Sequence, residues 1–155
     1  MDVKTDIAFS GNPVFNYKNT FTTSTQDGNL VQVNTKGQPN YTELNLSSDH
    51  YLTTTSKTLV ALDENKLRIR SNTVELDYGN YTSPIIFYIN DKIYVTTTDL
   101  QTKKVYLFDS QGKSIVNFPI YGSSSIVLDN IDHDRNLELI VKSEDDSMVV
   151  YEIER

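Results

Sequence analysis

The chain has 155 residues and a formal net charge of −7, because 14 lysines and arginines stand against 21 aspartates and glutamates. This acidity argues against nucleic-acid binding, which needs basic clusters. The sequence contains no cysteine, which excludes disulfides and thiolate chemistry. No apolar run approaches the ~18–20 residues of a membrane span, so we expect no membrane insertion.

Residues that favour strands run through the whole sequence. Threonine and tyrosine are abundant, whereas alanine, which favours helices, is scarce. A short apolar run at residues 6–10 comes first, and four groups of apolar runs bounded by turn residues follow it. The strands predicted in these groups are 13–17, 20–26, 29–37 and 40–46, then 50–56, 58–64, 65–72 and 73–79, then 84–90, 92–99, 104–112 and 114–122, and finally 125–129, 137–143 and 147–154.

The four groups repeat with a period near 40 residues. The third strand of each group begins at an apolar residue, and these residues are 37, 38 and 43 positions apart: Leu30, Leu67, Val105 and Met148. Four strands at this period are typical of a β-propeller blade, a small sheet that must stack on its neighbours. We therefore predict an all-β fold of the β-propeller type, with about four antiparallel four-stranded blades. A β-sandwich is the alternative. The predicted blades cover residues 11–46, 47–82, 83–122 and 123–155.

The fourth group contains only three predicted strands. In a closed ring, the strand at residues 6–10 would complete this last blade. In a piece of a larger propeller, it would belong to the preceding blade instead. An open arc would expose apolar blade faces and favour self-association through the blade edges. Residues 1–6 lack the apolar segment of a signal peptide, and we expect the chain to be part of a larger protein.

Two stretches in the last third of the chain resemble a known family. The sequence VYLFDSQGKSIVNFPIYG, at residues 105–122, resembles blades of quinoprotein-like and FG-GAP/VCBS propellers. There, one strand ends in Asp-x-x-Gly-Lys and the next in an aromatic–proline pair. The sequence NIDHDRNLELIV, at residues 130–141, resembles the calcium-loop half of an FG-GAP repeat. Quinoproteins stack their cofactor between a tryptophan and a vicinal disulfide. This chain has neither tryptophan nor cysteine, so we expect no quinone cofactor.

The resemblance implies a set of Ca²⁺ ligands on alternate residues of the second stretch. Calcium takes six to eight oxygens and tolerates irregular geometry. The sequence departs from the family at Asn130, where a carboxylate is lost, and at Arg135, where glycine would allow a tight turn. Asp129 partly restores the charge. Two hypotheses stay open, a weak calcium site and a solvated acidic turn. The implied ligands are Asn130, Asp132, Asp134 and Glu138 through their side chains, and Asn136 through its backbone carbonyl.

No catalytic site is predicted. His50 opens a strand and His133 lies in the acidic loop, and neither has a recognisable partner. The G-x-S-x-G nucleophile motif, the phosphate loop and the H-E-x-x-H zinc motif are absent from the sequence. Carboxylates that meet across blades, as in a glycoside hydrolase, would leave no spacing signature in the sequence.

Three tyrosines mark a candidate partner surface. The connectors at residues 77–84 and 118–125 place Tyr78, Tyr81 and Tyr121 near glycine turns. Exposed tyrosines stack on sugar rings or anchor protein partners, whereas buried ones would fill the core between blades. We expect a non-catalytic scaffold or a recognition module for a protein or surface partner, in an extracellular or periplasmic setting. A carbohydrate-binding module and a hydrolase are the alternatives.

Overall fold

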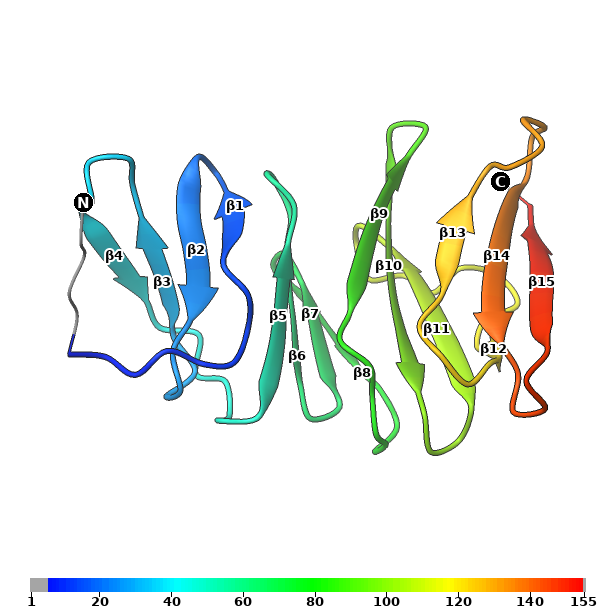
Figure 1. The fold of residues 1–155 in the computed structure, drawn as a ribbon, viewed down its shortest axis with the longest axis horizontal. Helices are drawn as coiled ribbons and strands as arrows, with labels where there is room; N and C mark the ends of the chain where they lie inside the picture. Colours follow the sequence, from blue (N-terminus) through cyan, green and yellow to red (C-terminus); the bar gives the residue numbers. More distant parts are fainter. Residues whose placement is uncertain (1–5, 155) are drawn as a thin grey trace. The chain divides into compact units, whose positions relative to one another are not determined.

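The computed structural model describes residues 6–154, and every regular element in this range is a β-strand. The strands form four antiparallel sheets (Figure 1). The prediction of an all-β chain is therefore confirmed. Within residues 6–154, no helix is long and apolar enough to cross a membrane. The chain divides into two units between Tyr78 and Gly79, and each unit holds two sheets.

The first unit contains two four-stranded sheets in which each strand pairs with the next along the chain. The first sheet consists of β1 (Phe15–Tyr17), β2 (Thr20–Ser24), β3 (Leu30–Val33) and β4 (Pro39–Thr42). The second sheet consists of β5 (His50–Thr54), β6 (Leu59–Asp63), β7 (Lys66–Ile69) and β8 (Asn72–Glu75). Buried side chains of both sheets and of the linker between them form one cluster: Leu30, Leu46, Leu52 and Ala61.

The second unit contains a four-stranded and a three-stranded sheet. The third sheet consists of β9 (Ile85–Ile89), β10 (Lys92–Asp99), β11 (Lys104–Asp109) and β12 (Ile120–Tyr121). The fourth sheet consists of β13 (Val127–Asp129), β14 (Leu137–Lys142) and β15 (Met148–Ile153). The two sheets share a buried apolar core: Tyr94, Val105, Leu107, Ile126, Leu128, Leu137, Leu139, Val141 and Ile153.

The sequence pattern of β14 explains how the fourth sheet is oriented. Leu137, Leu139 and Val141 are buried, whereas the alternating Glu138 and Ile140 are partly exposed. Successive side chains of a strand point to opposite faces. One face of β14 therefore belongs to the core, and the other carries Glu138 away from it.

Two hairpins are fixed by their turn residues. Lys18 and Asn19 join β1 to β2, and Asn90 and Asp91 join β9 to β10. All four residues have positive φ angles, between 49° and 61°. Two-residue loops of this kind are type I′ turns, whose twist matches that of the flanking strands. These turns set the register of the first and third sheets.

One backbone contact recurs in the first three sheets. After the fourth strand of each sheet, a backbone N–H donates to a carbonyl in the turn between the second and third strands. The same connection in three successive repeats supports the predicted repeat-like arrangement. The pairs are Leu46 N–H to Gly28 O (3.2 Å), Leu76 N–H to Asn65 O (2.8 Å) and Gly122 N–H to Lys103 O (3.0 Å).

The four sheets correspond to the four predicted groups of strands, but the strand predicted at residues 114–122 is mostly lost. Ser114 makes an isolated bridge to Phe108, and only β12 resumes the pairing. Between these points the chain leaves the ladder at residues 116–119. Pro119 has no backbone N–H to donate, which disfavours continuous pairing there.

The segment at residues 6–10 does not complete the fourth sheet. Phe9 forms an isolated bridge to Thr25, and Ser10 N–H donates to Ser24 O at 2.9 Å. The segment therefore lies along the end of β2 in the first sheet, on the edge that β1 also occupies. The prediction that it pairs with the last sheet is wrong. The side chain of Asn12 holds the segment in the first unit. Its Nδ2 donates to His50 O, and its Oδ1 accepts from Leu52 N–H, both in β5.

Candidate metal centre

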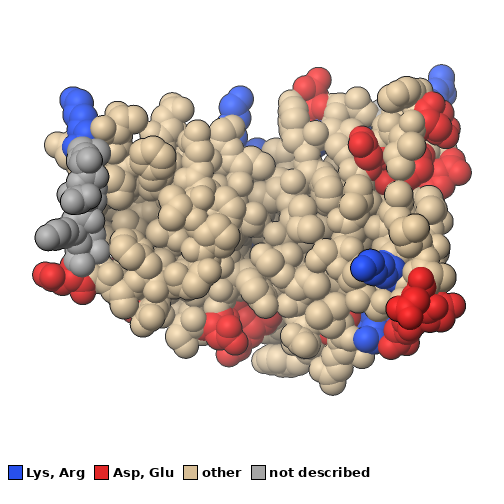
Figure 2. All heavy atoms as spheres, viewed as in Figure 1, with Lys and Arg blue, Asp and Glu red and all other residues tan. Residues whose placement is uncertain are grey.

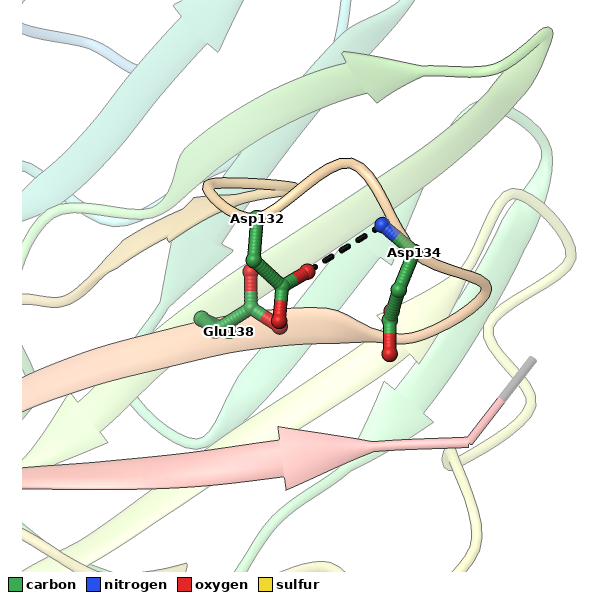
Figure 3. A group of neighbouring side chains, drawn as sticks. All are labelled: Asp132, Asp134 and Glu138. Atoms are coloured by element: carbon green, nitrogen blue, oxygen red, sulfur yellow. Dashed lines mark hydrogen bonds between the residues drawn. The ribbon is translucent and has the colours of Figure 1, made fainter.

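The loop between β13 and β14 gathers three carboxylates. Asp132 and Asp134 lie in the loop, and Glu138 lies near the start of β14 (Figure 3). One ligand oxygen from each lies within 4.8 Å of the others. Three carboxylates this close repel one another unless a cation or hydrogen-bond donors balance them.

Each carboxylate is held by one backbone N–H of the loop. Asp134 N–H donates to Asp132 Oδ1 at 3.1 Å, as Figure 3 shows. Asn136 N–H donates to Asp134 Oδ1 at 2.5 Å, and Ile131 N–H donates to Glu138 Oε2 at 2.7 Å. These bonds fix the orientation of the carboxylates and leave the second oxygen of each for another partner.

Asn130 contributes the most informative oxygen of the loop. Its side-chain Nδ2 donates to Asp134 O at 3.0 Å, which fixes the plane of the amide. Its Oδ1 atom is buried and has no hydrogen-bond partner among the described residues. A buried oxygen without a donor costs about 1–3 kcal/mol. A cation in the loop would remove this cost.

The spacing of the carboxylates fits one calcium ion. Calcium–oxygen distances of ~2.3–2.6 Å place two ligands of one ion at most about 5 Å apart. The carboxylate oxygens of Asp132, Asp134 and Glu138 meet this condition. All the donors are hard oxygens, which suit Ca²⁺ and Mg²⁺ better than softer transition metals.

Further carboxylates line the same side of the fourth sheet. Glu138 lies directly opposite Asp129 of β13 and directly opposite Glu152 of β15. Residues that face each other across antiparallel strands project their side chains to the same face, and like charges there are destabilising. On the face shown in Figure 2, acidic side chains gather at this end of the fourth sheet. In residues 6–154, none of these three acids takes part in an ion pair.

Arg135, which stands in the place of the family's glycine, is not among the residues with a positive φ angle. Among the described residues, the positive φ in this loop belongs to His133, at 63°. Histidine is among the residues that tolerate this conformation. Arg135 is exposed and lines a surface hollow together with Asp134.

Four of the five predicted ligands lie close together where the loop meets the start of β14: Asn130, Asp132, Asp134 and Glu138. The fifth, Asn136, turns its side-chain Nδ2 to Glu152 Oε1. Glu152 was missed by the sequence analysis. The signal that identifies it is the strand register, which sets it opposite Glu138.

The three predicted surface tyrosines have different environments. Tyr78 is 79% exposed and Tyr121 is 42% exposed, whereas Tyr81 is only 5% exposed. Tyr81 packs at 6.1 Å from the ring of Tyr106, and it forms an isolated bridge with Asp99. It is therefore a core residue, and its prediction as part of a partner surface is wrong. Tyr121 accepts a hydrogen bond from Glu144 N–H through its hydroxyl at 3.3 Å.

A buried serine–histidine pair lies in the first unit. His50 Nε2 lies 2.8 Å from Ser24 Oγ, and His50 Nδ1 lies 2.7 Å from Ser47 O. A carbonyl only accepts, so Nδ1 carries the proton and Nε2 accepts from the serine hydroxyl in the neutral ring. Ser24 is fully buried, and its Oγ also bonds Ser10 and Asn12. This network ties β2 to β5.

Asp99 carries a carboxylate that lies outside the loop and, unlike those of the loop, is buried. It is fully buried, and burial raises its pKa. Hydrogen bonds from the Thr102 hydroxyl and from the backbone N–H groups of Gln101, Asn80 and Thr102 outweigh burial, so the pKa of Asp99 lies below its ordinary value. Asp99 Oδ1 receives the Asn80 and Gln101 N–H groups at 3.0 and 2.9 Å. The carboxylate thus fastens the connector before β9 to the end of β10.

No known protein family matches the chain, and no curated protein is significantly similar to it. Its function is therefore inferred from the geometry of the described residues.

Proposed function

We propose that this chain is a non-catalytic recognition or scaffold module of the β-propeller type, and that its fourth repeat carries a weak calcium site. The observation that carries the calcium site is the loop at residues 130–138. There, three carboxylates converge within 4.8 Å beside the buried, unpartnered Oδ1 atom of Asn130. The resemblance of this loop to FG-GAP repeats agrees with the same ion.

The propeller part of the proposal is supported by the repetition of the sheets. Each sheet has its strands in chain order, as a propeller blade does. In each unit, two successive sheets share an apolar core. The recurrent backbone contact after the fourth strand, described above, gives three successive repeats the same connection.

The ion would have a structural role. It would supply positive charge to the carboxylates of Asp132, Asp134 and Glu138 and would give Asn130 Oδ1 a partner. The loop would then be fastened to the start of β14. An Asn in place of a carboxylate lowers the charge of the site, so an affinity in the range of extracellular modules, ~10⁻⁴–10⁻³ M, is expected. Such a site would be filled outside the cytosol, where calcium is plentiful.

The Ser24–His50 pair gives no support to hydrolysis by a serine nucleophile. This pair has the residue types of a nucleophile and a base, but Ser24 is closed to solvent. A nucleophile needs access to a substrate carbonyl or sugar. The pair therefore acts as a structural link in the first unit.

The test is calcium titration of chelator-treated protein by calorimetry, with a parallel thermal melt. We expect saturable heat and a higher Tm, because a ligand that binds only the folded state stabilises it by RT ln(1 + [L]/Kd). At a calcium concentration ten times Kd, this amounts to about 1.4 kcal/mol. Both effects should be lost in the double variant Asp132→Ala, Asp134→Ala.

A matched control removes the same charge from the same sheet. Asp145 and Asp146 lie in the exposed turn between β14 and β15. The double variant Asp145→Ala, Asp146→Ala should keep the calcium response. If the wild-type protein shows neither heat nor a melting shift at millimolar calcium, the loop is a solvated acidic turn and the calcium site is wrong. An equal loss in both double variants would show a nonspecific charge effect and would also reject the site.

A further inference from the structure

The turns at one end of the first unit are basic. Consecutive turns of an antiparallel sheet alternate between its two ends. The β1–β2 and β3–β4 turns therefore share one end of the first sheet, and the β5–β6 and β7–β8 turns share one end of the second. Lys18 N–H donates to Ser56 O at 2.9 Å, which holds these two ends together. Each of the four turns carries one basic residue and no acidic residue: Lys18, Lys36, Lys57 and Arg70.

The opposite end of the first unit is acidic. The turns and connectors there contain Asp27, Asp49, Glu64 and Asp77. Over strands β1 to β8, Figure 2 shows basic side chains along the upper edge of the molecule and acidic side chains along the lower edge. The basic end thus has the opposite sign to the whole chain, whose net charge is −7. An anion that approaches the unit would be attracted to this end.

A hollow of about 510 Å³ opens at the basic end, between the facing sides of the first two sheets. Its apolar lining comes from Leu30, Leu44 and Leu59. Two of the lining residues are tied across the sheets by hydrogen bonds. One is the bond of Lys18 N–H to Ser56 O, and in the other Arg68 Nη1 donates to Leu44 O at 2.6 Å. Bonds of the chain itself therefore hold the shape of the hollow.

Three cations surround this hollow. Lys18, Lys57 and Arg70 line it with exposed side chains, and none of the three forms an ion pair with a described residue. The Lys18 ammonium lies 5.1 Å from the centre of the Tyr17 ring, which also lines the hollow. None of the described residues that line the hollow is acidic. Three cations without a protein counter-charge favour an anionic ligand.

The uncharged part of the lining indicates what kind of anion fits. Gln32, Thr42 and Ser71 add amide and hydroxyl groups beside the leucines and Tyr17. Gln32 Nε2 donates to Thr20 Oγ1 at 3.2 Å, which holds the amide in place. A sugar ring offers C–H groups to apolar and aromatic side chains and hydroxyls to polar ones. An inorganic anion would use only the cations, and an acidic peptide would offer few hydroxyls.

We propose that this hollow binds an acidic saccharide that contains uronic-acid residues. Its carboxylates would meet Arg70, Lys18 and Lys57, and the planar guanidinium of Arg70 can donate to both oxygens of one carboxylate. The sugar ring would lie against Leu59 and Tyr17. This inference rests on the recognition role proposed above and gives it a ligand class, but it does not depend on the calcium site.

The probe is trigalacturonate, titrated into the full chain with chelator present and followed by the NMR shifts of the backbone amides. We expect saturable binding with a dissociation constant of roughly 1 mM or tighter. The shifts should concentrate at Lys18, Gln32, Lys57 and Arg70. The trimethyl ester of the same sugar keeps the rings and loses the charge, so it should bind at least about tenfold more weakly. Added salt should also weaken binding of trigalacturonate, because it screens exposed charges.

Two double variants locate the site. Lys57→Gln, Arg70→Gln removes two cations of the hollow and should weaken binding at least about tenfold. Lys36→Gln, Lys66→Gln is the matched control, because it removes the same charge from exposed positions of the same unit that do not line the hollow. The control should leave binding within about twofold of the wild type. Thermal melts of both variants should show folded proteins, since all four side chains are exposed.

Several results would overturn the proposal. These are no saturable binding at millimolar sugar, equal binding of the trimethyl ester, shifts away from the hollow, or equal losses in the two double variants. A capped tri-aspartate peptide carries the same number of carboxylates without sugar rings. Equally tight binding of this peptide would show that the hollow recognises charge alone and would reject the saccharide. Because chelator is present throughout, failure here leaves the calcium site standing, and failure of the calcium titration leaves this test intact.

Discussion

Two acidic sites in the second unit balance their charge in opposite ways. Asp99 is fully buried and receives hydrogen bonds from Asn80, Gln101 and Thr102. Asp132 and Asp134 are exposed, and each accepts one hydrogen bond from a backbone N–H. The chain supplies several donors to the single buried carboxylate of Asp99, whereas each loop carboxylate accepts only one backbone N–H.

This difference separates a structural carboxylate from a candidate ligand. A carboxylate that is saturated by its own chain has no capacity for an ion, and its removal damages the fold. Carboxylates that repel one another at short range cost stability until a cation arrives. Removal of one loop carboxylate should therefore raise the free energy of unfolding of the ion-free protein and lower that of the ion-bound protein. The four predictions below test this contrast from both sides.

The largest effect is expected for Asp99→Ala. The substitution removes the acceptor of two backbone N–H groups and of the Thr102 hydroxyl, all in partly buried hydrogen bonds. Because water reaches such groups only in part, the free energy of unfolding should fall by about 2–4 kcal/mol. Urea denaturation followed by circular dichroism measures this change.

Asp109→Ala is the matched control for Asp99→Ala. Asp109 also accepts two backbone N–H groups, from Gln111 and Lys113, but in an exposed turn. Water can replace the lost acceptor there, so we expect a loss of about 1 kcal/mol or less. Equal losses in the two variants would contradict the assignment of Asp99 as the buried clamp.

Gly79→Ala tests the same clamp from the other side. A Cβ atom at Gly79 would lie 2.6 Å from Asp99 Cγ and 2.6 Å from Asp99 Oδ2, closer than van der Waals contact allows. The carboxylate is held by its hydrogen bonds and cannot move away freely. We expect a loss of about 1–3 kcal/mol in the free energy of unfolding. In the Asp99→Ala background the clash disappears, so the two losses should not add. Additive losses would show that Gly79 acts elsewhere.

The pH dependence of stability should carry the signature of Asp99. Its folded-state pKa lies below the unfolded value of about 3.9, because its hydrogen bonds outweigh the effect of burial. The stabilisation is complete above the unfolded pKa and is lost as the pH falls through the folded pKa. The free energy of unfolding should therefore decline below about pH 4, and Asp99→Asn should make that decline shallower.

Asp145 provides the comparison for this pH profile. Hydrogen bonds from Ser147 and Ser143 lower the pKa of Asp145 too, but its side chain is exposed. Solvent screens such interactions, so Asp145→Asn should leave most of the acid-induced decline in place. A profile changed more by Asp145→Asn than by Asp99→Asn would contradict the assignment.

The contrast between the two sites also shows what the sequence could reveal. The loop was recognisable because its ligands alternate along the chain, and the local hydrogen bonds keep that order in space. The surroundings of Asp99 were not recognisable, because its partner Asn80 lies 19 residues away and meets it only through the fold. Glu152 was missed for the same reason, since the strand register alone brings it opposite Glu138.

The fold shows the same division between local and long-range information. Alternating apolar residues predicted the strands and their grouping, because periodicity is local. The pairing of residues 6–10 was predicted wrongly, because several open edges accept a short strand and the sequence does not rank them. The hydrogen bonds between Asn12 and β5 hold this segment in the first unit. Likewise, the burial of Tyr81 depends on its contact with Tyr106 of β11, which no local pattern reveals.

The smallest effect, and the one that changes sign, is expected for Asp134→Asn. The asparagine keeps an oxygen that can accept the Asn136 N–H and removes one charge from the cluster. In chelator, weaker repulsion should raise the free energy of unfolding by about 0.5 kcal/mol. In millimolar calcium, the variant should gain less stability than the wild type. The variant should therefore have the higher Tm in chelator, and the wild type should have the higher Tm in calcium. Asp146→Asn, in the exposed turn of the same sheet, removes the same charge and should leave the order unchanged. A variant less stable than wild type in chelator would mean that the loop carboxylates are already balanced by the chain, as Asp99 is, and the contrast between the two sites would fail.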